Sequence, residues 1–170
     1  VAIADADALL LDFDSANLVS LSIAITNPLD GTAERLAADT TGTGITAVYD
    51  SATATLTLSG VDSVANYQQV VRTVTYDNTT QAPDPTSRLV RFVANDGTST
   101  SPAATASVSI APLNDAPLAL NDAGSVVEGG SVLIDLAAND TDADSALDLA
   151  SLQIVSGPVN GSLVINGDGT

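Results

Sequence analysis

Acidic side chains recur at alternate positions in two short stretches of this 170-residue chain. The first stretch is Asp12-Phe13-Asp14, and the second is Asp140-Thr141-Asp142-Ala143-Asp144. In an extended loop, carboxylates two residues apart can reach the same point, and clustered oxygen ligands are what a hard cation such as Ca²⁺ requires. These stretches therefore make binding of a divalent cation the candidate chemistry of the chain.

The second stretch begins like the calcium loop of an EF-hand, but its later positions do not fit. The sixth position is Ser145 where that loop needs glycine, and the twelfth is Ser151 where it needs a bidentate glutamate. The flanking sequence does not suggest helices either. An EF-hand is therefore excluded.

Composition excludes several other kinds of site. The chain has no His and no Cys, which excludes the usual zinc, copper and haem sites and nucleophiles activated by histidine. Paired carboxylates could hydrolyse glycosides, but no aromatic platform for a sugar is apparent. The few aromatic residues are expected in the core: Phe13, Tyr49, Tyr67, Tyr76 and Phe92. We expect no enzymatic activity.

The charge balance limits the partners of the chain. It has 21 acidic residues against 4 basic ones, a formal net charge of −17, which opposes binding to nucleic acid or to an anionic membrane. A hydrophobic content of 45% opposes disorder, and no apolar run approaches the ~20 residues of a membrane span. Arg72, Arg88 and Arg91 are expected to form surface ion pairs of little energetic weight.

The elements that would position the acids are mostly β-strands separated by turn residues. One helix is expected at residues 62–71, capped by Asp62 or Ser63, with an apolar face. Regularly spaced strands with turn signals between them predict a β-sandwich. The expected strands are residues 1–11, 18–26, 34–38, 45–49, 53–59, 73–77, 88–94 and 103–111.

A polar segment ending in proline, residues 113–117, predicts a hinge between two domains. Behind it, strands are expected at residues 131–136, 149–155 and 162–165, followed by a turn at 166–170 with no further strand. The predicted organisation is a domain at residues 1–112, a linker at 113–117, and the N-terminal part of a second domain at 118–170.

An internal repeat supports this division. Asp12-Phe13-Asp14-Ser15-Ala16 matches Asp142-Ala143-Asp144-Ser145-Ala146, and Asp5 matches Asp135. A tandem copy of one unit is typical of an array. The first copy is expected to lack its first strand, because it has no counterpart of residues 118–130. Downstream of the acids, Leu18, Ser20, Leu21 and Ile23 match Leu149, Ser151, Leu152 and Ile154.

Three motifs in order resemble the cadherin-like β-sandwich repeats of large bacterial surface adhesins of the RTX type. Asn114-Asp115-Ala116-Pro117 resembles the linker between cadherin domains. The two Asp-x-Asp loops resemble the loop at the top of each cadherin domain, and Ala94-Asn95-Asp96-Gly97 resembles the end of the penultimate strand. The resemblance covers nearly the whole chain and implies an all-β fold of tandem cadherin-like or immunoglobulin-like Greek-key sandwiches.

The resemblance also implies calcium ligands. Asn114 and Asp115 of the linker would act with the acids of the second stretch, Asp140, Asp142 and Asp144, and with Asp62 from the base of the first domain. Asp12, Asp14 and Asp96 would serve a preceding joint. Pro112 and Ala116 stand where cadherins place further ligands, so weak binding is expected, about 10⁻⁴–10⁻³ M. The alternative is that these acids only solvate loops and cap turns.

The sequence thus predicts a Ca²⁺-stiffened structural repeat of an extracellular bacterial adhesin or surface fibre. Its expected partners are neighbouring repeats of the same chain, with homotypic fibre contacts or cell-surface glycans as further candidates. Two alternatives remain open: a carbohydrate-binding or accessory module of a secreted enzyme, and a self-assembling fibre subunit that a neighbour's strand completes.

Overall fold

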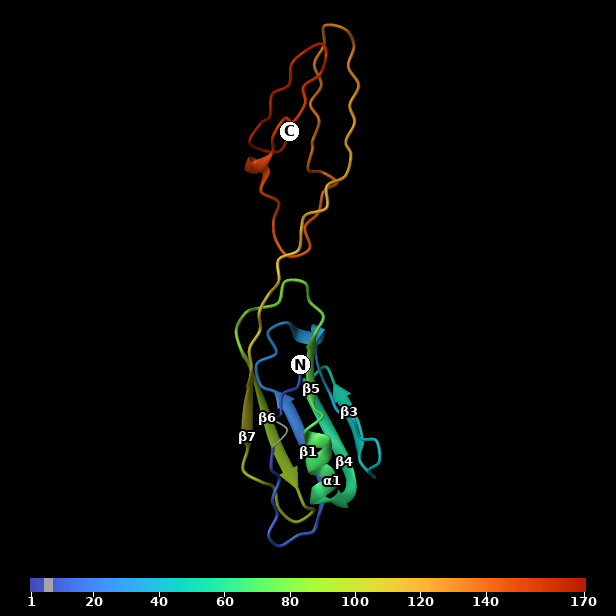
Figure 1. Ribbon diagram of the computed structural model, residues 1–170, viewed down its shortest axis with the longest axis vertical. Coiled ribbons are helices and arrows are strands. Elements are labelled where there is room, and N and C mark those ends of the chain that lie inside the picture. Colours follow the sequence, from blue (N-terminus) through green and yellow to red (C-terminus); the bar gives the residue numbers. More distant parts are fainter. Residues whose placement is uncertain (5–7) are drawn as a thin grey trace. The chain divides into compact units, whose positions relative to one another are not determined.

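Two units make up the part of the chain that the structure describes, residues 1–4 and 8–170 of a computed structural model. The first unit spans Val1–Pro112 and the second Leu113–Thr170. Regular secondary structure lies almost entirely in the first unit (Figure 1).

The first unit holds two antiparallel sheets and one helix. Its five-stranded sheet has the order β3-β4-β1-β6-β7, and its two-stranded sheet pairs β2 with β5. A single turn of 3-10 helix, Gly31–Ala33, precedes β2. The elements are β1 (Asn17–Ile25), β2 (Glu34–Ala37), β3 (Thr46–Asp50), β4 (Thr55–Ser63), α1 (Val64–Val71), β5 (Thr75–Asn78), β6 (Arg88–Asn95) and β7 (Ala104–Val108).

Strand β1 is the centre of the larger sheet. It pairs antiparallel with β4 on one side and with β6 on the other, as Figure 1 shows. Its apolar residues Leu21, Ile23 and Ile25 lie two apart and are buried, because alternate side chains of a strand point to the same face. This alternation sets the register of the sheet, since a slip of one residue would turn the apolar set outwards.

One hydrophobic core joins the two sheets and the helix. Leu36 of β2 and Tyr76 of β5 pack into the same cluster as the buried face of β1. Helix α1 adds Tyr67, Val70 and Val71 to this core. The predicted all-β, immunoglobulin-like sandwich is therefore confirmed for the first unit, with strand ends that differ from the predicted ones by a few residues.

The predicted helix is also confirmed, and Ser63 is its cap. The Ser63 hydroxyl oxygen accepts a hydrogen bond from the backbone N–H of Asn66 at 3.1 Å. Just before it, Gly60 has φ of +131°, and a Cβ there would lie 2.5 Å from the carbonyl oxygen of Gly44. The register of β1 and β4 shifts at this point, so the glycine forms the bulge that leads β4 into α1.

The N-terminal strand predicted at residues 1–11 is wrong for the part that the structure describes. An isolated bridge joins Ala2 to Thr75, and the backbone N–H of Tyr76 donates to the carbonyl of Val1 at 2.8 Å. Residues 8–11 are not paired into a sheet. Asp5, and with it the match to Asp135, lies outside the described residues.

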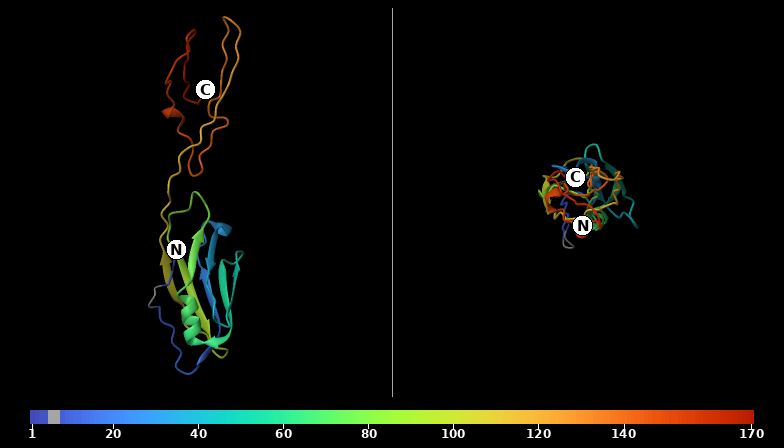
Figure 2. Two further views of the ribbon diagram at one scale, coloured as in Figure 1. Left: turned by 45° about the vertical axis from the view of Figure 1, so that its right-hand side comes forward. Right: turned by 90° about the horizontal axis from the view of Figure 1, so that it is seen from above.

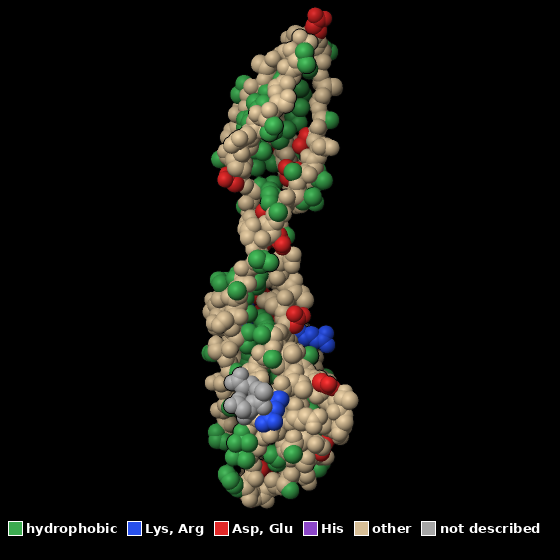
Figure 3. Space-filling model, viewed as in Figure 1, with side chains coloured by type: hydrophobic (Ala, Val, Ile, Leu, Met, Phe, Trp, Pro, Cys, Tyr) green, Lys and Arg blue, Asp and Glu red, His purple; other side chains and the backbone are tan. Residues whose placement is uncertain are grey.

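The strands predicted in the second unit are also wrong. Residues 113–170 contain an isolated bridge between Leu118 and Thr141 and one turn of 3-10 helix, Leu149–Ser151, and are otherwise drawn as loops (Figure 2). Hydrophobic side chains reach the surface of this unit (Figure 3), and Val155 and Val159 are almost fully exposed. An extended segment forms a strand only when a neighbouring segment makes hydrogen bonds with its backbone N–H and C=O groups. The described part of the second unit shows no ladder of such backbone hydrogen bonds between these segments.

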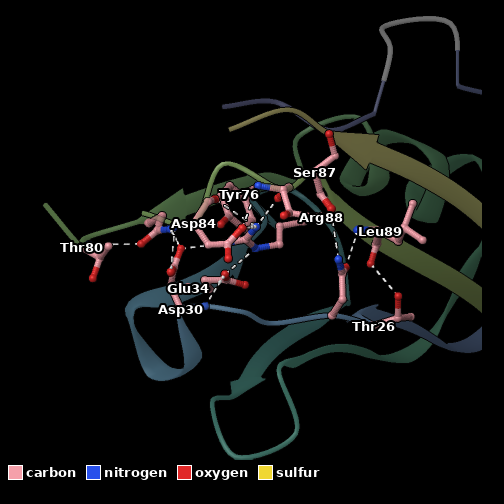
Figure 4. Close-up of polar contacts among 12 residues, drawn as sticks. Thr26, Asp30, Glu34, Tyr76, Thr80, Asp84, Ser87, Arg88 and Leu89 are labelled. Atoms are coloured by element: carbon pink, nitrogen blue, oxygen red, sulfur yellow. Dashed lines mark hydrogen bonds and ion pairs between the residues drawn. The ribbon is translucent and has the colours of Figure 1, made fainter. Parts of the chain in front are cut away.

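Arg88 is buried, which contradicts its predicted role in a surface ion pair. Its Nη2 lies 2.6 Å from Oδ2 of Asp30, and its Nε lies 2.6 Å from Oε1 of Glu34 (Figure 4). Its Nη1 donates to the backbone carbonyls of Asp84 and Thr86. Arg88 and Glu34 are completely buried, so this cluster ties β6, β2 and the intervening loops together. The burial of Arg88 could have been predicted from its position, because it lies two residues before Val90 in the same strand and alternate side chains share a face.

Of the five aromatic residues predicted in the core, Phe13 is an exception. Its side chain is 96% exposed, whereas Tyr67 and Tyr76 are buried. Tyr49 and Phe92 are partly buried and pack against the core. Phe13 is exposed because it lies in the loop before β1, outside the alternation that directs side chains inwards.

No helix among the described residues is long and apolar enough to cross a membrane.

Candidate cation sites

Three carboxylates of the first unit come together at one end of the larger sheet. The loop with Asp12 and Asp14 leads into β1, and Asp96 directly follows β6. The antiparallel register pairs Ser20 with Asn95, so the beginning of β1 and the end of β6 share this end. Carboxylate oxygens of the three aspartates all lie within 4.8 Å of one another.

Backbone hydrogen bonds fix the shape of both loops. Oδ1 of Asp12 accepts from the backbone N–H groups of Asp14 at 3.1 Å and Ser15 at 2.9 Å. Oδ1 of Asp96 accepts from Thr98 at 2.7 Å and Ser99 at 2.6 Å. These are turn-capping bonds, the structural role that the sequence left open. Each carboxylate has a second oxygen that could ligate a cation.

The aspartates repel one another. The hydrogen bonds from the backbone of Ser15 and Asp14 lower the pKa of Asp12. The pKa of Asp14 is raised, first by its side-chain contact and charge interaction with Asp12 and further by the charge of Asp96. A cation bound here would remove this repulsion.

The same three aspartates line a cavity of about 520 Å³ in the first unit. Apolar side chains form much of the rest of its wall, among them Leu10, Leu21 and Phe92. The cavity gives an ion room to keep some of its water ligands.

Replacing Asp14 by asparagine is expected to stabilise the first unit slightly in a chelator at pH 7. Because the pKa of Asp14 is raised in the folded chain, ionisation of Asp14 lowers the unfolding free energy. This loss of stability develops as the pH rises from 3.8, the ordinary pKa of an aspartate, through the raised pKa of the folded state. Asparagine removes the charge. Thermal melting between pH 3 and pH 7 measures the effect.

The control for this prediction is Asp77→Asn, which removes one charge from an exposed position of β5. If Asp14→Asn and Asp77→Asn shift the melting temperature equally at every pH, the repulsion at Asp14 has no consequence for stability.

The acidic loop of the second unit repeats the geometry of the first. Oδ1 of Asp142 accepts from the backbone N–H groups of Asp144 at 3.1 Å and Ser145 at 3.0 Å. These bonds correspond to those of Asp12 with Asp14 and Ser15. They lower the pKa of Asp142, with the bond from the Asp144 backbone as the largest cause.

The segment predicted as a linker lies beside this loop within the second unit. Leu118 and Thr141 exchange two backbone hydrogen bonds, at 2.8 and 3.1 Å. The backbone N–H of Asp115 donates to Oδ2 of Asp144 at 2.8 Å. The structure thus brings the backbone of Asp115 close to the carboxylate of Asp144, which neighbours Asp142 in the acidic loop. Their role as calcium ligands stays a prediction.

Asp144 has one oxygen that the fold does not satisfy. Its Oδ1 is buried and makes no hydrogen bond within the described structure. A buried carboxylate oxygen without a partner is costly, and a cation would be a suitable partner. Oxygen donors of this kind fit Ca²⁺.

The remaining predicted ligands of the second unit have local partners. Oδ1 of Asp140 accepts from the backbone N–H of Leu120 at 2.7 Å. The side-chain amide of Asn114 donates to the carbonyl of Asp115 at 2.6 Å. Asp140 therefore supports the loop, while the side-chain oxygen of Asn114 could still ligate a cation.

Asp62 lies at the end of the larger sheet that carries Asp96, where it pairs with Leu18. Its carboxylate accepts from the backbone N–H groups of Gly44 and Ser63, both at 2.7 Å, which lowers its pKa. Asp62 thus supports the turn before α1, and its role as a ligand together with Asn114 and Asp115 stays a prediction.

Comparison with known proteins bears on the second unit. Residues 114–170 match the family model of the bacterial Ig domain. No curated protein and no solved structure gives a significant match to the chain. Residues 114–170 are therefore similar to the bacterial Ig domain, a coarser likeness than the cadherin-like repeat of an adhesin that the motifs resemble.

Proposed function

We propose that the chain is a calcium-stiffened structural repeat of an extracellular bacterial adhesin or surface fibre. The family match supports the general part of this proposal, because bacterial Ig domains are often surface-exposed structural modules. The observation that carries the calcium part is the buried, unpartnered Oδ1 of Asp144 in a loop whose geometry recurs at Asp12 and Asp14.

Stiffening would follow from where the ligands lie in the chain. Asn114 and Asp115 lie at the start of the second unit, directly after its boundary with the first, and Asp142 and Asp144 lie further along the same unit. An ion held by both groups would fix the start of the second unit to its acidic loop and remove the conformational freedom of that first segment. Without the ion, repulsion between the carboxylates would favour a looser arrangement.

Calcium is expected to raise the stability of the wild-type chain. With a dissociation constant of about 10⁻⁴–10⁻³ M, 10 mM Ca²⁺ would add roughly 1.4–2.7 kcal/mol to the unfolding free energy of the unit that binds it. Isothermal titration calorimetry and thermal melting, with Ca²⁺ and with chelator, measure binding and stabilisation.

Asp144→Asn should abolish the heat of the second-unit site, and Asp14→Asn that of the first. Asp77→Asn, which removes the same charge elsewhere, should leave both sites intact. X-ray scattering of the same samples reports stiffness. Equal melting curves and equal scattering with Ca²⁺ and with chelator would refute the proposal.

A further inference from the structure

The outer face of the larger sheet, opposite the core, carries almost no charge. The register aligns its outward side chains in three rows that cross β3, β4, β1 and β6 (Figure 1). Within these rows β4 and β1 contribute only Ser, Thr and Ala. In a chain with a net charge of −17, another acidic molecule meets the least repulsion at such a surface. The three rows run from Thr46 to Asn95, from Val48 to Val93, and from Asp50 to Arg91.

Asp50 and Arg91 are the charged residues of this face, and they lie at opposite ends of one row. Two strands separate β3 from β6, so their backbones are about 14 Å apart, too far for an ion pair within one chain. Asp50 accepts from the backbone N–H of Ala52 at 2.9 Å and the hydroxyl of Thr53 at 3.0 Å. The exposed Arg91 side chain has no hydrogen bond or ion pair in the described part of the chain.

The three rows are complementary to themselves. A two-fold axis parallel to the strands, midway between β4 and β1, places β3 of one copy opposite β6 of a second copy. Asp50 of each copy then faces Arg91 of the other, so the contact contains this ion pair twice. The same axis places Val48, which is 64% exposed, opposite Val93. A surface patch that fits a rotated copy of itself is the requirement for a symmetric dimer.

We propose that this face of the first unit binds the same face of a second copy of the chain, with ion pairs between Asp50 and Arg91. Both copies would point in the same direction, because the axis is parallel to the strands. The short, uncharged side chains of β4 and β1 let the two sheets approach closely. The proposal does not depend on calcium.

The size of the face predicts a weak contact. Four strands and three rows cover about 20 Å by 20 Å, so a dimer would bury roughly 800 Å² in total, below the size of stable interfaces. We therefore expect a dissociation constant of roughly 0.1–1 mM for the isolated chain.

Charge reversal tests the proposed pairing. Sedimentation equilibrium of the full chain is measured from 0.02 to 2 mM protein in 0.15 M NaCl. Asp50→Arg and Arg91→Asp each place like charges at both ends of the contact and should each weaken association by at least about 10-fold. An equimolar mixture of these two variants should associate like the wild type, because opposite charges then face each other at both ends. Arg35→Asp, the same change on β2 of the smaller sheet, should leave association unchanged.

Cross-linking provides a second probe. Asp50 also supports its turn, so melting curves verify that Asp50→Arg folds, and the second probe leaves Asp50 intact. Val48→Cys and Val93→Cys each introduce one thiol into a chain without cysteine, and one variant is labelled with ¹⁵N. A short bismaleimide should link labelled to unlabelled chains in the mixture. Neither variant alone should cross-link, because identical positions of the two copies lie about 14 Å apart.

Four results would overturn the proposal. One is a wild-type chain that stays monomeric at 2 mM. Another is a mixture of the two charge variants that associates no more than either variant alone. The third is an equal loss from Arg35→Asp and Arg91→Asp, and the fourth is a cross-link between two Val48→Cys chains.

Discussion

Replacing Arg88 by methionine is expected to lower the unfolding free energy of the first unit by about 3–5 kcal/mol. The guanidinium is completely buried and contacts Asp30 and Glu34 at 2.6 Å each. Without it, Glu34 remains completely buried and Asp30 almost so, and neither negative charge has its cation. Chemical denaturation followed by circular dichroism measures the loss.

Two further variants distinguish the buried charge from other effects. Arg91→Met alters an exposed arginine of the same strand and should change stability by no more than about 0.5 kcal/mol. Adding Glu34→Met to Arg88→Met removes one uncompensated charge and should recover part of the loss. Equal effects of Arg88→Met and Arg91→Met would show that the buried cluster contributes little.

Ile23→Ala is expected to destabilise the first unit by about 2–5 kcal/mol. Ile23 is fully buried at the centre of the sheet between β4 and β6, and truncation would leave a cavity that the paired strands cannot close. The loss is measured by denaturant unfolding of the full chain.

The internal repeat supplies the control for this prediction. Ile154 occupies the matching sequence position but is 46% exposed, so Ile154→Ala should change stability by no more than about 0.5 kcal/mol. A large loss of stability from Ile154→Ala in the full chain would contradict the structure of the second unit.

Local pattern was sufficient to predict most of the first unit. The alternation of apolar residues in β1 and β4, and the turn residues between strands, identify the elements because burial on one face imposes period two. Helix α1 was predicted from its apolar face and a cap at Asp62 or Ser63, and the structure shows Ser63 as the cap.

Features that depend on distant residues were not predicted. Arg88 is buried because Asp30 and Glu34, more than fifty residues earlier, supply its charge partners. The prediction placed Arg88 on the surface because of its charge, although its position in the alternation of the strand indicated the buried face. Phe13 is the converse case. Its hydrophobicity alone suggested a core position, but it lies in the loop before β1 and is exposed.

In the second unit, the sequence predicted strands that the structure does not contain. Residues 149–155 have the pattern of β1, yet pattern specifies a strand only when other strands pair with it. The backbone of Asp115 lies beside the carboxylate of Asp144 because the Leu118–Thr141 bridge aligns the two segments, and the role of these acids as calcium ligands stays a prediction.

The order of the strands along the chain has a consequence for biosynthesis. A ribosome releases β1 early, whereas β4 ends at Ser63 and β6 at Asn95. The nascent chain must therefore keep the β6 edge of this hydrophobic strand unpaired until the 70 residues from the end of β1 at Ile25 to the end of β6 at Asn95 have emerged. A translational pause before Asn95 would prolong the interval in which that strand can join another nascent chain and aggregate.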